Sequence, residues 1–128
     1  PSDLEWSKSS PIVADAFARF ASVIESNAVD CLPGDVLIWA SKKINDWDGS
    51  DPGLGRGWVE EAIAELDGEN KNTGRLVLLT ALAPYQVDDS IVRSFTDSFP
   101  GEKKLLIALA WASFTTARKI GTWLQVVD

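Results

Sequence analysis

Three carboxylates lie close together in a glycine-rich stretch near the middle of the chain. Asp46, Asp48 and Asp51 fall within the segment NDWDGSDPGLGRG, residues 45–57. Spaced carboxylates can bind calcium, because this hard cation prefers several oxygen ligands. The calcium loop of EF-hand proteins has glycine at its sixth position and glutamate at its twelfth, whereas this chain has Asp51 and Gly57 there. Aspartates that form turns and cap helices explain the stretch better, and we predict no metal site.

Two neighbouring groups of residues each have a functional and a structural interpretation. The run GLGRG at Gly53–Gly57 lacks the spacing of both the dinucleotide and the P-loop fingerprints. Arg56 beside a helix start can still hold an anion, or the glycines simply let the chain pass closely between packed helices. Glu60 and Glu61 can act as general acids or bases in a pocket, or they can stabilise the start of a helix through its dipole.

Arg118 is the charged residue most closely associated with an apolar helix. It follows the run LLIALAWASF at residues 105–114 and shares a helical face with Trp111 and Phe114. A partly buried arginine needs a carboxylate partner. We therefore interpret Arg118 either as half of a structural ion pair or as a contact to a substrate.

The composition excludes several classes of site and partner. The 128 residues include no histidine and one cysteine, Cys31, so His-centred triads, most zinc sites and an internal disulfide are excluded. We predict no cofactor. The net charge of −7 argues against binding to nucleic acid or to anionic membranes, because both are usually bound through clustered Lys and Arg. The single cysteine and the absence of an apolar signal segment predict a cytoplasmic protein.

Hydrophobic periodicity predicts an all-α fold: one domain, residues 1–128, that forms a bundle of six helices after a loose lead-in at residues 1–10. The helices are expected at residues 11–26, 33–44, 58–66, 75–83, 88–99 and 100–125. In the second helix the residues predicted to face inward are Val36, Leu37, Trp39, Ala40 and Ile44. Residues 27–32 are predicted to form a turn and residues 67–74 an exposed connection. The apolar run at 105–114 is about half of a membrane span, so we expect it to form the buried central post of the bundle, with no membrane insertion.

Short motifs occur in a fixed order along these predicted helices. They are Leu32-Pro33, WVEEA at Trp58–Ala62, Val87-Asp88-Asp89, FPGEKKLL beginning at Phe99, and TARKIG at Thr116–Gly121. This order resembles the alkylhydroperoxidase-like, or carboxymuconolactone decarboxylase-like, helical family over most of residues 11–124. The resemblance implies an all-α bundle that assembles into oligomers.

Peroxidatic members of that family carry a glutamate, then Cys-x-x-Cys, then a histidine nineteen residues after the glutamate. When this pattern is laid without gaps on the chain, Trp39 takes the glutamate position, Asp51 and Leu54 take the cysteine positions, and Trp58 takes the histidine position. Thiol peroxidase chemistry needs an attacking thiolate, a resolving thiol and a proton relay. The resemblance therefore implies a divergent member without peroxidase activity.

The first functional hypothesis is that the former redox pocket binds a small, largely apolar molecule. Acid/base chemistry of the isomerase, lyase or cyclase type would use Asp51 as the base and Arg118 or Tyr85 as its charge partner. The residues expected to line the pocket are Trp39, Trp58, Tyr85 and Trp111, drawn from the six tryptophans and one tyrosine of the chain.

The second hypothesis is a non-catalytic assembly or protein-interaction module. Residues 75–83 and 105–114 are very apolar for a monomer of this length. In this interpretation the tryptophans fill a core or a subunit interface, and the protein is a homo-oligomer, whether a dimer, a trimer or a hexamer.

Overall fold

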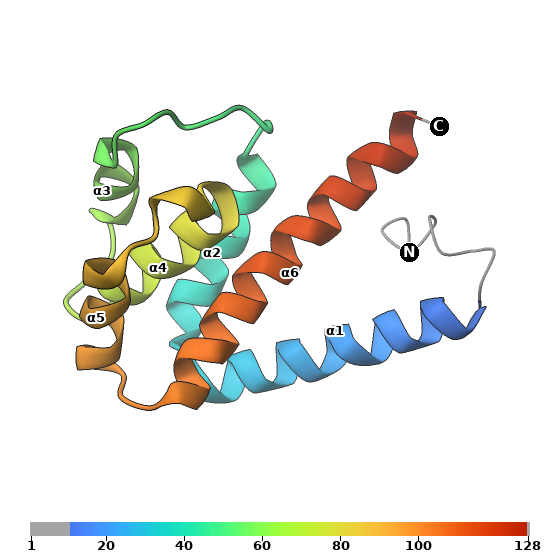
Figure 1. Ribbon diagram of the computed structural model, residues 1–128, viewed down its shortest axis with the longest axis horizontal. Helices are drawn as coiled ribbons and strands as arrows, with labels where there is room; N and C mark the ends of the chain where they lie inside the picture. Colours follow the sequence, from blue (N-terminus) through green and yellow to red (C-terminus); the bar gives the residue numbers. More distant parts are fainter. Residues whose placement is uncertain (1–10, 128) are drawn as a thin grey trace.

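The computed structural model describes residues 11–127, with side-chain surroundings for residues 15, 16 and 18–121. Within this range the fold is all-α, as the sequence predicts (Figure 1). The predicted lead-in at residues 1–10 lies outside the described residues. The elements are α1 Pro11–Cys31, α2 Gly34–Asp46, α3 Gly57–Ile63, α4 Asn70–Leu82, the 3₁₀ turn η2 Pro84–Gln86, α5 Asp89–Ser98 and α6 Glu102–Val127.

Helix α4 is the central element of the domain, and it packs against α2, α3, α5, η2 and α6. Leucine, valine and alanine make its second half, residues 76–82, apolar nearly all round, and such helices are normally buried. The Leu-rich helix is thus confirmed, but it begins at Asn70, so the predicted exposed connection at 67–74 is wrong in its second half. The buried residues of α4 are Thr73, Gly74, Leu76, Val77, Leu78, Leu79 and Ala81.

Helix α1 continues five residues past its predicted end at Ser26, and the predicted turn at 27–32 is wrong. Ile24, Ala28 and Leu32 are buried, so the apolar face of the helix continues into the segment that was expected to turn. Pro33 then disfavours helical geometry in the residue before it, and the chain turns into α2. The five residues of α2 that were predicted to face inward are all buried.

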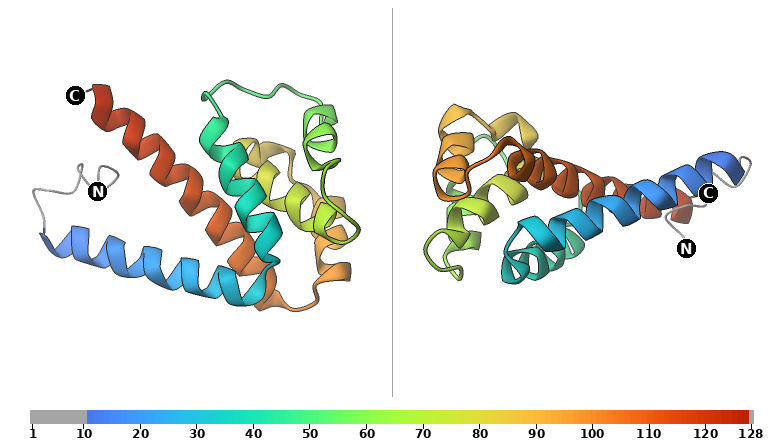
Figure 2. Two further views of the ribbon diagram at one scale, coloured as in Figure 1. Left: turned by 180° about the vertical axis from the view of Figure 1, so that it is seen from behind. Right: turned by 90° about the horizontal axis from the view of Figure 1, so that it is seen from below.

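Helix α6 is more exposed than the predicted central post. Ala108, Trp111 and Ala112 are buried in the core, but the Leu106 side chain is 56% exposed. The helix is 26 residues long and packs against α1, α2, α4 and α5. Figure 2 shows the second half of α6 and the first half of α1 extending together beyond the body made by α2 to α5. A helix that extends beyond its neighbours cannot be buried on every side.

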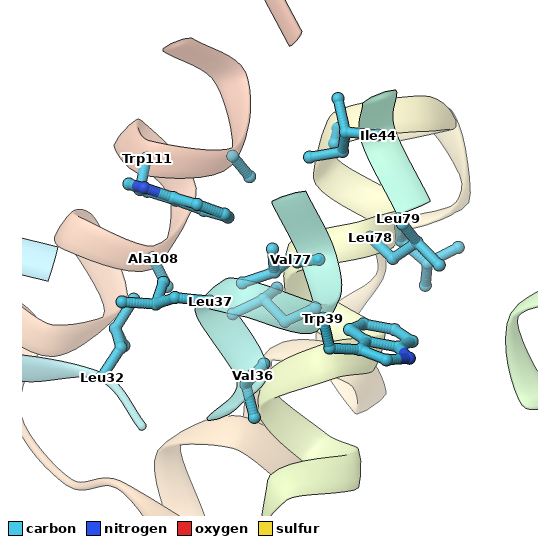
Figure 3. Packing of buried hydrophobic residues seen from close by; sticks show 14 of the residues in the cluster. Leu32, Val36, Leu37, Trp39, Ile44, Val77, Leu78, Leu79, Ala108 and Trp111 are labelled. Carbon is cyan, nitrogen blue, oxygen red and sulfur yellow. The ribbon is translucent and has the colours of Figure 1, made fainter. Parts of the chain in front are cut away.

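The core lies where α2, α4 and α6 meet, and Figure 3 shows Leu37 of α2 next to Val77 of α4, with Ala108 and Trp111 of α6 beside them. None of the helices in the described part of the chain is long and apolar enough to cross a membrane.

Candidate functional site

The glycine-rich segment forms a loop, residues 47–56, between α2 and α3. The Asp48 carboxylate accepts hydrogen bonds from the backbone N–H of Ser50 at 2.9 Å and from its hydroxyl at 2.6 Å. Asp51 accepts one from the backbone N–H of Gly53 at 2.9 Å. These local bonds are typical of aspartates in turns. The structure thus gives both carboxylates the turn-forming role that the sequence favours over calcium binding.

Two side chains of η2, Tyr85 and Gln86, hold this loop from the other side, and we call the pair the loop clasp. The Tyr85 hydroxyl donates to the carboxylate of Asp51 and lies 2.9 Å from the carbonyl oxygen of Gly53. The Gln86 amide nitrogen donates to the carbonyl oxygens of Gly53 at 2.8 Å and Gly55 at 3.0 Å. Backbone carbonyls of the loop are thus satisfied by side chains more than thirty residues away in sequence.

The clasp also reaches Trp58, at the start of α3. The indole N–H of Trp58 donates to the Gln86 amide oxygen at 3.1 Å, so the buried glutamine uses both ends of its amide group. Three residues predicted for the site, Asp51, Tyr85 and Trp58, therefore meet in one hydrogen-bond network. Gln86 connects them, and the sequence interpretation missed it because an isolated glutamine after a helix end carries no signal of burial.

Arg56 joins the same network to the start of α5. Its guanidinium donates to the backbone oxygen of Gln86 at 3.2 Å and to the Asp88 carboxylate at 3.1 Å. The sequence offers Asp88 or Asp89 as the cap of this helix. Asp88 takes that role by accepting from the backbone N–H of Ile91 at 3.1 Å. The anion that Arg56 meets is thus a carboxylate of the chain itself.

The electrostatics of the clasp make Asp51 a weak base. The hydrogen bond from Tyr85, followed by that from the Gly53 N–H, lowers the pKa of Asp51 below its ordinary value. The same Asp51 contact raises the pKa of Tyr85. A general base is most effective when its pKa lies near the working pH. This carboxylate is instead ionised at neutral pH and is already used as an acceptor.

Trp39 and Trp111 belong to the hydrophobic core, on α2 and α6, and Figure 3 shows them separated by Leu37 and Val77. Trp39 is 9% exposed and Trp111 is 2% exposed. The indole nitrogens of both side chains are buried without a hydrogen-bond partner. Buried polar groups usually have a partner, so these two N–H groups are the unexplained polar atoms among the predicted site residues.

Arg118 is half-buried on α6, in the part of the helix that follows the core residues. Its helical neighbour Phe114 packs edge-on against Phe20 of α1, with ring centroids 5.4 Å apart. The next residue, Lys119, donates to the backbone oxygen of Asn45 near the end of α2. Of the six predicted site residues, Asp51, Trp58 and Tyr85 therefore belong to the hydrogen-bond network around the clasp. Trp39 and Trp111 belong to the core, and Arg118 lies farther along α6.

Comparison with known proteins gives one informative relationship. No family model and no solved structure matches the chain. The chain is 36% identical over 124 residues to a protein named alkyl hydroperoxide reductase from Mycobacterium tuberculosis, and this alignment covers 97% of the chain. The chain spans only 36% of the length of that relative. This relationship over nearly the whole chain, together with the all-helical fold, supports an alkylhydroperoxidase-like family.

Proposed function

We propose that the chain is an alkylhydroperoxidase-like domain that does not itself reduce hydroperoxides and serves as an assembly or protein-interaction module. The proposal rests on one observation: the residues at the family's redox positions serve the packing and hydrogen bonding of this domain. Trp39 is part of the core, Asp51 is bonded to Tyr85, and Trp58 is bonded to Gln86. Each takes part in the packing or hydrogen bonding of the domain.

The thiol chemistry supports the same proposal. In a dithiol peroxidase a thiolate attacks the peroxide oxygen and releases an alcohol, and a second thiol then displaces water from the sulfenic acid to form a disulfide. This chain has one thiol, Cys31, at the end of α1. The resolving step has no second thiol within the chain.

The test is an alkyl hydroperoxide reduction assay with the purified chain and a dithiol reductant. We expect the same rate as for the Cys31→Ser variant, which removes the one thiol of the sequence. A rate that exceeds background and disappears in Cys31→Ser or in Asp51→Asn would overturn the proposal, because it would show a working thiol or a working carboxylate.

A second candidate function is the binding of a small, largely apolar molecule, and the two unpaired indole N–H groups favour it. A ligand with one carbonyl or ether oxygen would supply the acceptor that the Trp39 or Trp111 N–H group lacks. The exposed Asp51–Tyr85 pair offers a carboxylate and a hydroxyl for acid/base chemistry of the isomerase, lyase or cyclase type, and Arg118 offers a positive charge. In this proposal Trp58 lines the same site.

Native mass spectrometry of the purified protein tests this candidate. Trp39→Phe keeps an aromatic ring but removes the N–H group, and Trp47→Phe is the matched control because the Trp47 N–H donates to Ser50 within the loop. A small-molecule adduct that is lost only in Trp39→Phe supports ligand binding. Protein that carries no adduct, and that gains none when incubated with apolar carbonyl compounds, contradicts it.

A further inference from the structure

One solvent-facing stripe of α6 has a composition that is unusual for an exposed helix face. Leu106 is 56% exposed and Ile120 is 39% exposed, and Ser113 and Ala117 between them are also exposed. With the half-buried Ala110 these residues follow a spacing of four, three, four and three, which is the spacing of a helix-pairing seam. We call these five residues the α6 seam.

The seam lacks the charged residues that normally cover an exposed helix face. The sequence from Leu105 to Ala117 contains no Asp, Glu, Lys or Arg. In Figure 1 no other helix passes in front of α6. Ala110 is partly packed against the core, and the other four seam residues are exposed. A charge-free exposed stripe of small and aliphatic residues indicates a surface that packs against another helix.

The order of residue sizes in the seam is the same in both directions. Ser113 stands at the centre, alanines stand one turn away on each side, and Leu106 and Ile120 stand seven residues away on each side. An antiparallel pair of such helices places Leu106 of one against Ile120 of the other. The small residues at the centre let the two backbones approach closely. A two-fold interface requires a surface that is complementary to itself, and the seam meets that requirement at Ser113 and at the Leu106–Ile120 pair. The two alanines lie opposite Thr116 and Leu109 of the second copy.

The charges beside the seam favour the antiparallel arrangement. Lys103 and Arg118 lie toward its two ends. Parallel pairing of two copies would place each of these cations against the same cation of the other copy, and like charges repel. Antiparallel pairing about Ser113 places Arg118 opposite Ala108 and Lys103 opposite position 123, neither of which is charged. The helix dipoles also oppose each other in this arrangement.

We propose that the α6 seam is a dimerisation surface and that its occupant is the same seam of a second copy of this chain, antiparallel about Ser113. This inference rests on the assembly role proposed above and names the partner and the surface. Neither the clasp nor the core residues take part in it.

Sedimentation velocity over a range of protein concentrations is the first test. We expect a dimer for the natural chain and at least tenfold weaker association for Ser113→Glu, since two carboxylates would then meet at the centre of an apolar interface. Ile38→Glu is the matched control, because Ile38 is 74% exposed on a different helix, α2, and the variant adds the same charge. A dimer that Ser113→Glu leaves intact would overturn the proposal, and so would a natural chain that stays monomeric at every concentration.

Single cysteines in a Cys31→Ser background test the orientation. We expect Ser113→Cys to form a disulfide with position 113 of the second copy under mild oxidation, because facing positions at a close helix crossing fall within disulfide range. Leu106→Cys should not cross-link two copies, because position 106 of the second copy lies at the far end of the antiparallel pair. Cross-linking of both variants would indicate parallel pairing and overturn the inference.

These outcomes are separable from those of the proposed function. A dimer that reduces hydroperoxides would overturn the non-catalytic role and leave the seam intact. A monomer without hydroperoxide turnover would overturn the seam and leave the absence of peroxidase activity intact.

Discussion

At the residue scale, the centre of the candidate site is a glutamine. Gln86 is 8% exposed and satisfies two loop carbonyls and one indole N–H with a single amide group. An amide can do this because it carries both donors and an acceptor. The loop, η2 and the start of α3 are therefore connected by one side chain.

Replacement of Gln86 by leucine tests that role. The variant keeps the approximate volume but leaves the Trp58 N–H and the Gly55 carbonyl without their partner, and it removes the amide donor from the Gly53 carbonyl. We therefore expect the free energy of unfolding to fall by about 2 kcal/mol. Urea denaturation followed by circular dichroism measures the change. Tyr85→Phe is the control, because Tyr85 is 58% exposed and water can replace its hydroxyl, and it should lose less than about 1 kcal/mol. Equal stability of the leucine variant and the natural chain would contradict the clasp.

The acid dependence of stability also belongs to single residues. The Ser90 hydroxyl, the Ile91 N–H and Arg56 lower the pKa of Asp88 from 3.8 to about 2. Because this pKa is depressed in the folded state, the carboxylate stabilises the fold above the unfolded value of 3.8, and that contribution is lost as the pH falls toward 2. The pKa values of Asp48 and Asp51 are shifted in the same direction.

We therefore expect the urea midpoint of unfolding to decrease as the pH falls from the range above 3.8 toward 2. Asp88→Asn retains a capping oxygen but cannot titrate, so its midpoint should fall less steeply over the same range. Parallel curves for the variant and the natural chain would show that Asp88 does not contribute to the acid sensitivity.

At the scale of the elements, the packing of α4 depends on one glycine. A Cβ atom on Gly74 would lie 2.5 Å from Cδ1 of Leu66 and 3.1 Å from Cζ3 of Trp39. This close approach brings α2 and the turn that follows α3 against α4. It also explains why the segment before Arg75 is buried, although its polar residues suggest an exposed connection.

Gly74→Ala should therefore destabilise the domain by about 1–3 kcal/mol through overpacking. Gly34→Ala, at the first position of α2, is the matched control because a Cβ there would meet nothing within 4 Å. We expect the control to change the stability by less than about 0.5 kcal/mol. Thermal denaturation of both variants measures the difference, and equal effects would contradict the packing role of Gly74.

At the scale of the whole molecule, the chain is similar to a reductase over nearly its whole length but lacks the cysteine pair and the histidine of the family's redox site. The chain is related to an alkyl hydroperoxide reductase over nearly its whole length, yet it has one cysteine and no histidine. A fold depends on a distributed apolar pattern, whereas a catalytic site depends on a few side chains, so the first can persist after the second has changed.

Dimerisation through the α6 seam predicts a stability that depends on concentration. Association with a second copy stabilises the folded state by mass action, so the melting temperature of the natural chain should rise with protein concentration. Ser113→Glu should abolish that dependence while Ile38→Glu retains it. Differential scanning calorimetry at several concentrations makes the comparison, and a constant melting temperature for the natural chain would argue against the dimer.

The sequence by itself determined the features that depend on local patterns or on residue types. Helical periodicity identified six helices and the inward face of α2. The cap of α5 was narrowed to Asp88 or Asp89, because capping involves residues only three apart. The motif order indicated the family. The absence of histidine and of a second cysteine excluded dithiol and His-based chemistry within the chain without any structural information.

Only the tertiary structure decided which segments meet. The extension of α1 to Cys31 and the early start of α4 follow from burial against other helices. The meeting of Asp51, Tyr85 and Trp58 around Gln86, and the exposure of the α6 seam, depend on contacts between residues far apart in the chain. Periodicity shows that a helix has an apolar face but not which neighbour covers it, because that depends on the packing of all the helices together.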